Sequence, residues 1–265
     1  MLCAVTDKDL IFRFLSRQSE LHIYELGDLE DDYFAHTQWY AWDTEGVEAL
    51  ALLYTAQKPA TLIAIEDHVE PAYERLLEAL LPGLPNELNV HVSPRLAFVF
   101  EAAYPVRSCV EHLKMIWRGK ADDEPGASEG LLPAGMSLHR LEAGDIPALR
   151  DLYAAGYPRN WFDADMFAHG RYFGVRHGEA LIAAAGTHVC APSYGVAAIG
   201  NVATHPDYRG RRLARVVSAA LCASLSRDVA HIGLNVHAAN HAAIAVYRTL
   251  GFVDVTRYCE LQLSR

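Results

Sequence analysis

The stretch HPDYRGRRLA, residues 205–214, gathers basic side chains at one short turn of an otherwise acidic chain. Arg209, Arg211 and Arg212 surround Gly210, although the whole chain has a formal net charge of -10 at pH 7. A strand-like stretch, AAIGNVAT, precedes the turn, and an amphipathic helix pattern follows it. The first N–H groups of a helix have no partner inside it, and the helix dipole adds partial positive charge there. The pattern predicts a strand–turn–helix anion site. A solvated, charged helix start has the same pattern.

A second segment, LNVHAANHAAIAVYRTLGF at residues 234–252, predicts another helix with its own start and stop signals. Asn240 is a candidate N-cap, and Gly251 ends the helix. Ala243 and Tyr247 fall on one face of this helix, because residues four apart lie one above the other. A tyrosine on such an apolar face is typical of a core residue. The helix by itself therefore assigns no activity.

Together the two segments resemble the signatures of the GNAT superfamily of acyl-CoA-dependent N-acyltransferases. In that family a strand ending like NVATHPDYRG leads into Arg/Gln-x-x-Gly-x-Gly/Ala, and the matching residues here are RGRRLA at 209–214. The second hallmark is Asn-x-x-Ala-x-x-x-Tyr followed by Gly-Phe. It is matched by Asn240, Ala243, Tyr247 and the pair at 251–252. Two motifs in the right order carry the resemblance.

The resemblance implies a site for acetyl-CoA as co-substrate. Backbone groups at the strand end would bind the acyl and pantetheine parts, and amides of the turn would bind the pyrophosphate, so that the arginines face a polyanion. The implied cofactor-binding residues are Val202, Ala203, Thr204, Arg209, Gly210, Arg211, Arg212, Leu213, Ala214, Asn240, Ala243 and Tyr247. The family usually has glycine at the position of Arg212. The arginine would either narrow the approach of the pyrophosphate or add a contact to it.

The resemblance also implies that an amine attacks the thioester directly, with Tyr247 protonating the departing CoA thiolate. Family members place a general base at three positions, which here are Ala198, Gly200 and Asn235. None of these side chains accepts a proton at neutral pH. We therefore expect the proton to leave through ordered water near Asn235, with His188 as the best single side-chain base, because histidine titrates near neutrality. The other candidate bases near the expected cleft are His205 and His237.

Residues 119–136 read as a linker, because they are rich in Gly, Pro, Ala and acids and lack periodicity. The predicted order β-β-β-α-β-α-β occurs on both sides of this segment. We predict an α/β fold with mixed sheets in two GNAT-like halves, residues 1–118 and 137–265. The matching junction of the first half has no glycine and carries Glu66, Asp67 and Glu70 where phosphates would lie, and acidic groups there would repel phosphate. The first half therefore resembles a degenerate copy, as in tandem GNAT proteins of the glycine N-acyltransferase-like group. An unrelated α/β domain is the alternative.

The composition limits the classes of protein to which this chain can belong. Half of the 265 residues are hydrophobic (51%) and 21% are charged, which is typical of a globular chain. The acidic balance argues against general binding to nucleic acid. No apolar run reaches the length of a membrane span and no secretion signal is visible, so we expect a cytoplasmic protein that does not bind membranes. The cysteines lack CxxC spacing, which predicts reduced thiols and no metal site. They are Cys3, Cys109, Cys190, Cys222 and Cys259.

Our main functional hypothesis is transfer of an acetyl group from acetyl-CoA to the primary amine of a small molecule, by a monomer or homodimer. The segment YPRNWFD, residues 157–163, lies where GNAT proteins place acceptor-binding residues, and Arg159 would hold an acceptor carboxylate. One alternative is N-terminal acetylation of a protein, since residues 234–252 resemble the ribosomal-protein alanine acetyltransferases. Another is a non-catalytic acyl-CoA-binding regulator, against which the intact Tyr247 argues.

Overall fold

The structure is a computed structural model that describes residues 1–265 except 69, 120–131, 159 and 161. The described chain forms two compact units, and neither is continuous in sequence. Unit 1 contains Met1–Met115, Val236–Asn240 and Asp254–Arg265, and unit 2 contains Ile116–Asn235 and His241–Val253. Mixed sheets with helices packed on them confirm the predicted α/β class. Within the described part of the chain, no helix is both long and apolar enough to cross a membrane.

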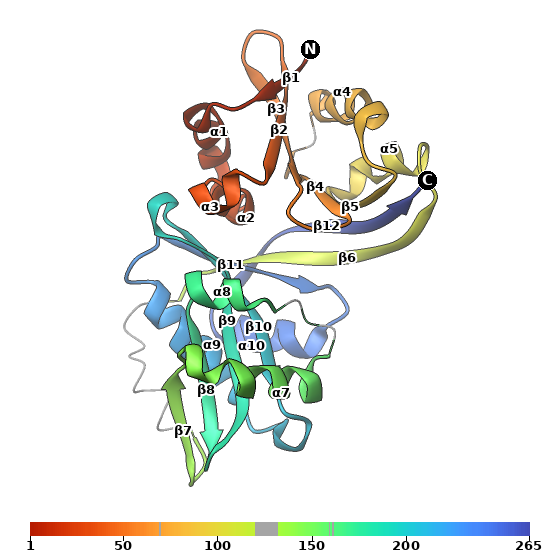
Figure 1. The fold of residues 1–265 in the computed structure, drawn as a ribbon. Coiled ribbons are helices and arrows are strands. Elements are labelled where there is room, and N and C mark those ends of the chain that lie inside the picture. The colour runs from red at the N-terminus through yellow and green to blue at the C-terminus, as the bar shows by residue number, and fades with distance from the viewer. Residues whose placement is uncertain (69, 120–131, 159, 161) are drawn as a thin grey trace. The chain divides into compact units, whose positions relative to one another are not determined.

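Unit 1 is built around a sheet in the order β1-β2-β3-β4-β5-β12-β6 (Figure 1). Its pairs for which the register is known are antiparallel, except the parallel pair β4–β5. Strand β12 (Phe252–Ser264) comes from the far end of the chain. The other elements are β1 (Leu2–Val5), α1 (Lys8–Leu15), α2 (Ile23–Gly27), α3 (Asp31–Phe34), β2 (Thr37–Asp43), β3 (Val47–Tyr54), β4 (Ala60–Ala64), α4 (Pro71–Leu80), β5 (Glu87–Val92), α5 (Ala97–Glu101) and β6 (Val106–Trp117).

Local signals in the sequence explain the helices of unit 1. The side chain of Asp7 accepts hydrogen bonds from the backbone N–H groups of Asp9 (2.9 Å) and Leu10 (3.1 Å), which caps the start of α1. Helix α4 begins at Pro71, whose missing N–H costs nothing in a first turn. Its apolar face and that of α5 bury the main core of the unit against the sheet, where Leu261 of β12 is fully buried.

In unit 1 the strand β4 stays paired with the parallel strand β5 along its whole length. Five residue pairs join them, from Ala60–Leu88 to Ala64–Val92. Beyond the strands, the Ser93 hydroxyl accepts a hydrogen bond from the N–H of Glu66 and donates one to its carbonyl oxygen, both at 2.8 Å. The two strand ends are therefore tied together rather than separated.

The carboxylate of Glu66 points into unit 1 instead of toward an incoming ligand. The Tyr73 hydroxyl donates a hydrogen bond to Glu66 Oε1 (2.6 Å), and His22 Nε2 lies 3.6 Å from the same oxygen. His22 Nδ1 also lies 3.2 Å from Glu25, whose other oxygen is 3.8 Å from Lys114 Nζ. The acid that we expected to repel phosphate thus belongs to a buried polar network that fills this part of the unit.

Unit 2 contains a sheet in the order β11-β10-β9-β8-β7, in which only β10 and β11 are parallel. Helix α7 packs on one face through Leu149, Leu152 and Tyr153, and α9 packs on the same strands from behind (Figure 1). The elements are β7 (Met136–Arg140), α7 (Ile146–Gly156), α8 (Ala164–His169), β8 (Tyr172–His177), β9 (Ala180–Ala191), β10 (Val196–Thr204), α9 (Leu213–Leu225), β11 (His231–His237) and α10 (His241–Thr249).

The compact units do not coincide with the contiguous halves 1–118 and 137–265. The last strand is the reason, because residues 254–265 of β12 pair with β5 and belong to unit 1. In return, the end of β6 belongs to unit 2, where the Trp117 indole donates to the carbonyl of Leu250 at 2.7 Å. Most of the predicted linker 119–136 lies outside the described residues. The division into two halves by descent stays a prediction.

Candidate active site

The parallel strands β10 and β11 separate after a short paired stretch. Among the described residues they pair at Val196–His231, Ala197–Ile232 and Ala198–Gly233, and no further pair follows. Strand β10 nevertheless continues to Thr204. The backbone N–H and C=O groups on this edge of β10, beyond Ala198, have no β11 partner, although such groups need one when buried. We call this separation of β10 from β11 the opening; predicted residues Val202, Ala203 and Thr204 lie on the part of β10 that is not paired with β11.

A β-bulge places His188 beside this opening. Ala198 pairs with Val189 and Ile199 pairs with Thr187, so His188 is the extra residue between them on β9. Bulges re-aim a side chain and bend their strand. A side chain at Gly200 would meet the His188 ring, because a Cβ built there comes within 2.6 Å of three ring atoms. The His188 ring thus occupies the space next to Gly200, which is one of the three positions where family members place a general base.

Burial sets the protonation of His188. Desolvation lowers the pKa of the imidazole below its ordinary value of 6.5, and a side-chain hydrogen bond with Asn201 acts against this shift. The ring is therefore neutral at neutral pH, which is the form that accepts a proton. The role of His188 as a base stays a prediction.

A second irregularity bends β10 at Asn201. Gly200 pairs with Gly186 and Ala203 with Ala184, so one extra residue lies on β10 between them. Asn201 has φ +50, a left-handed conformation that asparagine tolerates better than most residues. Its carbonyl accepts a hydrogen bond from Tyr153 of α7 (3.0 Å). Neither Asn201 nor Tyr153 was identified from the sequence, since only the bulge brings them to the site; the sole signal was an asparagine inside a strand pattern.

The arginine turn forms an open helix start. Gly210 has φ +75 and Arg212 has φ +62, so two residues of the turn are left-handed just before α9. No described side chain hydrogen-bonds to the first N–H groups of this 13-residue helix. A Cβ at Gly210 would meet nothing within 4 Å. Unsatisfied N–H groups, the helix dipole and open space together suit a phosphate.

The arginines of the turn have different surroundings. Arg209 donates a hydrogen bond to the carbonyl of Gly156 at the end of α7 (3.0 Å), so this side chain joins two elements. Arg211 lies over the ring of Tyr208, with its guanidinium carbon 5.1 Å from the centroid. Arg211 and Arg212 are exposed. The charge at the turn therefore includes guanidinium groups that remain accessible to a polyanion.

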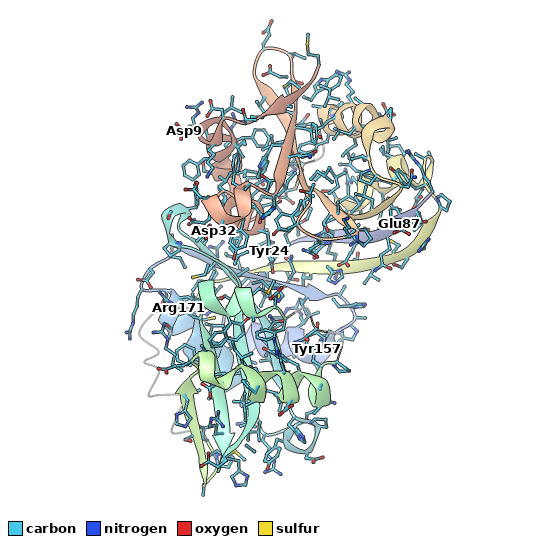
Figure 2. All side chains as sticks on the ribbon, in the orientation of Figure 1. Asp9, Tyr24, Asp32, Glu87, Tyr157 and Arg171 are labelled. Atoms are coloured by element: carbon cyan, nitrogen blue, oxygen red, sulfur yellow. The ribbon has the colours of Figure 1, made fainter. Side chains whose placement is uncertain are left out.

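Tyr247 of α10 is buried at 9% exposure, and its ring meets Phe252 edge-on at 5.7 Å. Burial raises its pKa well above the ordinary value, and the nearby Tyr157 and Cys222 act in the same direction. The phenol is therefore protonated throughout the physiological pH range. Tyr157, labelled in Figure 2, directly follows α7 and is 45% exposed. It is an accessible hydroxyl close to Tyr247.

Two further polar groups of the site have no protein partner. Asn235 Oδ1 and Thr204 Oγ1 are buried and make no hydrogen bond within the described chain. Asn235 lies on β11 just beyond its last pair with β10, and Thr204 ends β10. Buried polar atoms are usually satisfied, so these two leave room for a water or a ligand group. Asn235 thus stands where a bound water is expected.

A cavity of about 330 Å³ lies between α7 and the residues that follow it in the chain. Tyr153 and Phe162 supply aromatic walls, and Asn160 Nδ2 is buried there without a hydrogen-bond partner in the described structure. The lining residues are Arg150, Tyr153, Ala154, Pro158, Asn160 and Phe162. Arg159, the residue expected to hold an acceptor carboxylate, lies outside the described residues.

Most of the predicted site residues fall in unit 2. The exceptions are the candidate base His237 and Asn240, which directly precedes α10 in the chain; both belong to unit 1. Ala243 lies on α10, four residues before Tyr247. Leu213 is buried at the first turn of α9, with Ala214 next to it. In the described part of the chain, no group of three or more His, Cys, Asp or Glu side chains could hold a metal ion.

Known proteins share this fold. Residues 138–252 match the family model described as Acetyltransferase (GNAT) family. The [ribosomal protein bS18]-alanine N-acetyltransferase of Escherichia coli K12 is 31% identical over 125 residues, which are 45% of this chain and 82% of that protein. The GCN5-related N-acetyltransferase from Sphaerobacter thermophilus has a TM-score of 0.62 at 16% identity, covering 99% of this chain and 95% of its own. A tandem GNAT protein from the clavulanic acid biosynthesis pathway has a TM-score of 0.60 at 16% identity, covering 99% and 98%. The likeness in fold runs through both units and confirms the predicted tandem arrangement.

Proposed function

Because the chain belongs to the GNAT family of acyl-CoA-dependent N-acetyltransferases, we propose that unit 2 transfers the acetyl group of acetyl-CoA to the primary amine of a small molecule. The observation that carries this proposal is the opening between β10 and β11 beside the uncapped start of α9. The freed edge of β10 binds the acetyl and pantetheine parts through its backbone. The turn at 209–214 binds the pyrophosphate.

The amine attacks the thioester carbonyl directly. A bond forms between nitrogen and the acetyl carbon, the carbon–sulfur bond breaks, and CoA leaves as a thiolate. Tyr247 donates a hydrogen bond to the leaving sulfur. Its raised pKa lies above that of a thiol, near 8.5, so the phenol stabilises the developing charge without giving up its proton completely. This role needs only the protonated phenol that burial maintains.

The attacking amine must first lose a proton. His188 is neutral, lies over Gly200 at the start of the opening and accepts that proton in our proposal. Water held at Asn235 Oδ1 is the second route, since this buried oxygen has no partner in the described chain. The two routes differ in their dependence on pH, because only the histidine titrates near neutrality.

The acceptor binds on the α7 side in this proposal. The cavity of about 330 Å³ suits a small molecule, since ligand pockets begin near 300 Å³. Arg150 and the unpartnered Asn160 Nδ2 offer hydrogen-bond donors there, while Tyr153 and Phe162 offer apolar walls. An amine that also carries an anionic or carbonyl group fits this lining.

A second candidate acceptor is the N-terminus of a protein. The relative from Escherichia coli acts on the alanine of ribosomal protein bS18 by its name, and 31% identity to it favours this alternative. Both reactions use the same acetyl-CoA site, and they differ only in what binds beside α7.

One assay separates these possibilities. The full chain is incubated with acetyl-CoA and either a panel of small primary amines or peptides that begin with alanine. Release of CoA thiol and the mass of the product are measured together. We expect turnover with a small amine and none with the peptides. Turnover with peptides alone assigns the protein substrate, and tight binding of acetyl-CoA without thiol release from any amine assigns a non-catalytic regulator.

A further inference from the structure

Unit 1 contains a pair of cysteines on neighbouring strands. Cys109 lies on β6 and Cys259 on β12, and these strands are adjacent in the sheet. Their side chains share a hydrogen bond, although the two residues are far apart in sequence. Both are free thiols; Cys109 is exposed and Cys259 is half-buried. Neither takes part in the acetyl-transfer mechanism.

The strands run antiparallel around this pair. Ser264 N donates to the carbonyl of Pro105 (3.2 Å) near one end of β6, and Arg118 N donates to that of Gly251 (2.9 Å) just past the other. Residue numbers therefore increase along β6 in the direction in which they decrease along β12.

An ion pair fixes the face on which the cysteines meet. Arg257 contacts Glu111 through a side-chain hydrogen bond between the same two strands. Glu111 lies two residues after Cys109, and Arg257 lies two residues before Cys259. In an antiparallel pair, such a step leads from one facing pair to the next on the same face. The thiol pair and the ion pair are consecutive cross-strand contacts.

Facing residues of antiparallel strands suit a disulfide. Their Cα atoms lie about 4.5–5.5 Å apart, and a disulfide requires about 4.4–6.8 Å. We propose that Cys109 and Cys259 are a redox modification site, at which a low-molecular-weight disulfide such as oxidised glutathione converts the two thiols into a reversible cross-strand disulfide.

The reaction balances as two thiol–disulfide exchanges. The exposed Cys109 thiolate attacks one sulfur of oxidised glutathione, which forms a mixed disulfide and releases one glutathione thiol. The Cys259 thiolate then attacks Cys109 Sγ, which forms the protein disulfide and releases the second glutathione. Each protein thiol gives up one proton, and each leaving thiolate takes one. The protein thiols are oxidised and the small disulfide is reduced.

The two cysteines have different roles in this sequence. Burial raises the pKa of Cys259 to about 11, and the neighbouring Cys109 thiol contributes to the shift. Cys259 is therefore the slower nucleophile, and it acts second, when its partner has been activated as a mixed disulfide. The exposed Cys109 is the residue that meets the oxidant.

The bond would enclose residues 109–259, which include all of unit 2. A disulfide stabilises a fold mainly by restricting the unfolded chain, and it does so more strongly for long loops. The oxidised protein should therefore resist thermal unfolding better than the reduced protein. The effect requires no activity of the enzyme, so it is independent of the proposed function.

The test uses the full chain, oxidised with glutathione disulfide under native conditions. Free thiols are counted after denaturation, intact mass is recorded, and peptides are mapped without reduction. We expect wild type to lose two of its five thiols without gaining glutathione, with a peptide linking Cys109 to Cys259, and to regain them in dithiothreitol. The thermal midpoint should rise on oxidation.

Three variants make the result decisive. Cys259→Ser should stop at one glutathione adduct on Cys109, and Cys109→Ser should form neither adduct nor crosslink in unit 1. Cys3→Ser, which changes another cysteine of the same unit, should behave as wild type. Stable glutathionylation of wild-type Cys109 without a crosslink overturns the proposal, as does a disulfide that links other cysteines.

Discussion

At the scale of single residues, burial shifts the pKa values of the two proposed proton-handling groups in opposite directions: it raises that of Tyr247 and lowers that of His188. It keeps the Tyr247 phenol protonated and keeps the His188 imidazole neutral. Desolvation disfavours the charged form of each, which is the anion for tyrosine and the cation for histidine. One environment thus prepares a hydrogen-bond donor and a proton acceptor in the same unit.

Tyr247→Phe should lower kcat by about 10²-fold or more, because it removes the donor to the leaving sulfur and little else. The dissociation constant for acetyl-CoA should change little, since the ring still packs on Phe252. Steady-state kinetics and calorimetry measure the two quantities. Tyr40→Phe, on β2 of unit 1, is the control. Unchanged turnover would remove Tyr247 from the mechanism.

If His188 is the base, kcat/KM should rise with pH through the histidine pKa, because only the neutral ring accepts a proton. Burial lowers that pKa, so the acidic limb should lie below pH 6.5. His188→Gln should remove the limb and lower the rate, while His139→Gln, on the exposed face of β7, should keep both. A His188→Gln enzyme with an unchanged profile would leave the water at Asn235 as the route.

Arg212 has a left-handed backbone conformation, which is unfavourable for a residue that carries a side chain. Its φ of +62 costs an L-residue roughly 1 kcal/mol, and glycine avoids that cost. Arg212→Gly should therefore raise the free energy of unfolding by up to about 1 kcal/mol, as measured by denaturant titration. Weaker acetyl-CoA binding in the same variant would assign the arginine a phosphate contact. Unchanged or tighter binding of acetyl-CoA would show that the Arg212 side chain only narrows the approach of the pyrophosphate.

At the scale of elements, the two parallel strand pairs differ in their pairing, and this difference predicts which unit binds acetyl-CoA. β10 and β11 separate after three pairs, whereas β4 and β5 stay joined and Ser93 extends the closure. A ligand that inserts between strands needs the first arrangement. The closed strands, rather than acidic repulsion alone, account for the expected loss of binding in unit 1.

Calorimetry should therefore find one acetyl-CoA per chain, with an affinity that falls as salt rises, because phosphate contacts are screened. Arg211→Ala should weaken binding and flatten this salt dependence. Arg209 is a poorer probe, since it also holds the end of α7 through Gly156. Two sites per chain would contradict the closure of β4 and β5. Affinity independent of salt would contradict the phosphate role of the turn.

The sequence predicted the elements better than their junctions. Periodicity and caps revealed α9 and α10, because a helix is specified by residues three and four apart. The bulges at His188 and Asn201 left no such signal, since a bulge is defined by the partner strand. His188 was selected for its chemistry and its expected place near the cleft, and its position over Gly200 required the register of β9 against β10. Tyr153 was missed because its role depends on a contact 48 residues away.

At the scale of the whole molecule, the last strand matters more than its place in the sequence suggests. β12 lies between β5 and β6 in unit 1, so the contiguous first half lacks an inner strand of its own sheet. No local pattern predicts such a partner, because pairing over this separation is a property of the folded chain. The boundary between the halves was read from composition, which says nothing about where β12 pairs.

Two fragments, residues 1–118 and 119–265, should therefore fold poorly alone and combine when mixed. The first lacks β12 between β5 and β6, and the second carries β12 without β5. Co-elution on gel filtration and recovery of a cooperative thermal transition would measure the recombination. Independent cooperative unfolding of fragment 1–118 would show that β12 is dispensable.

The pairing of β12 with the strands of unit 1 also affects how a tandem gene can evolve. A copy without a substrate is normally free to decay, since no selection maintains it. Here the deletion of that copy would strip the cover from Leu261 and Leu263 of β12, which are 0% and 3% exposed, and would present an apolar strand edge to other chains. If the first half is an inactive copy, we therefore expect selection against aggregation to retain it, with sequence change confined to positions where β12 does not lie against it.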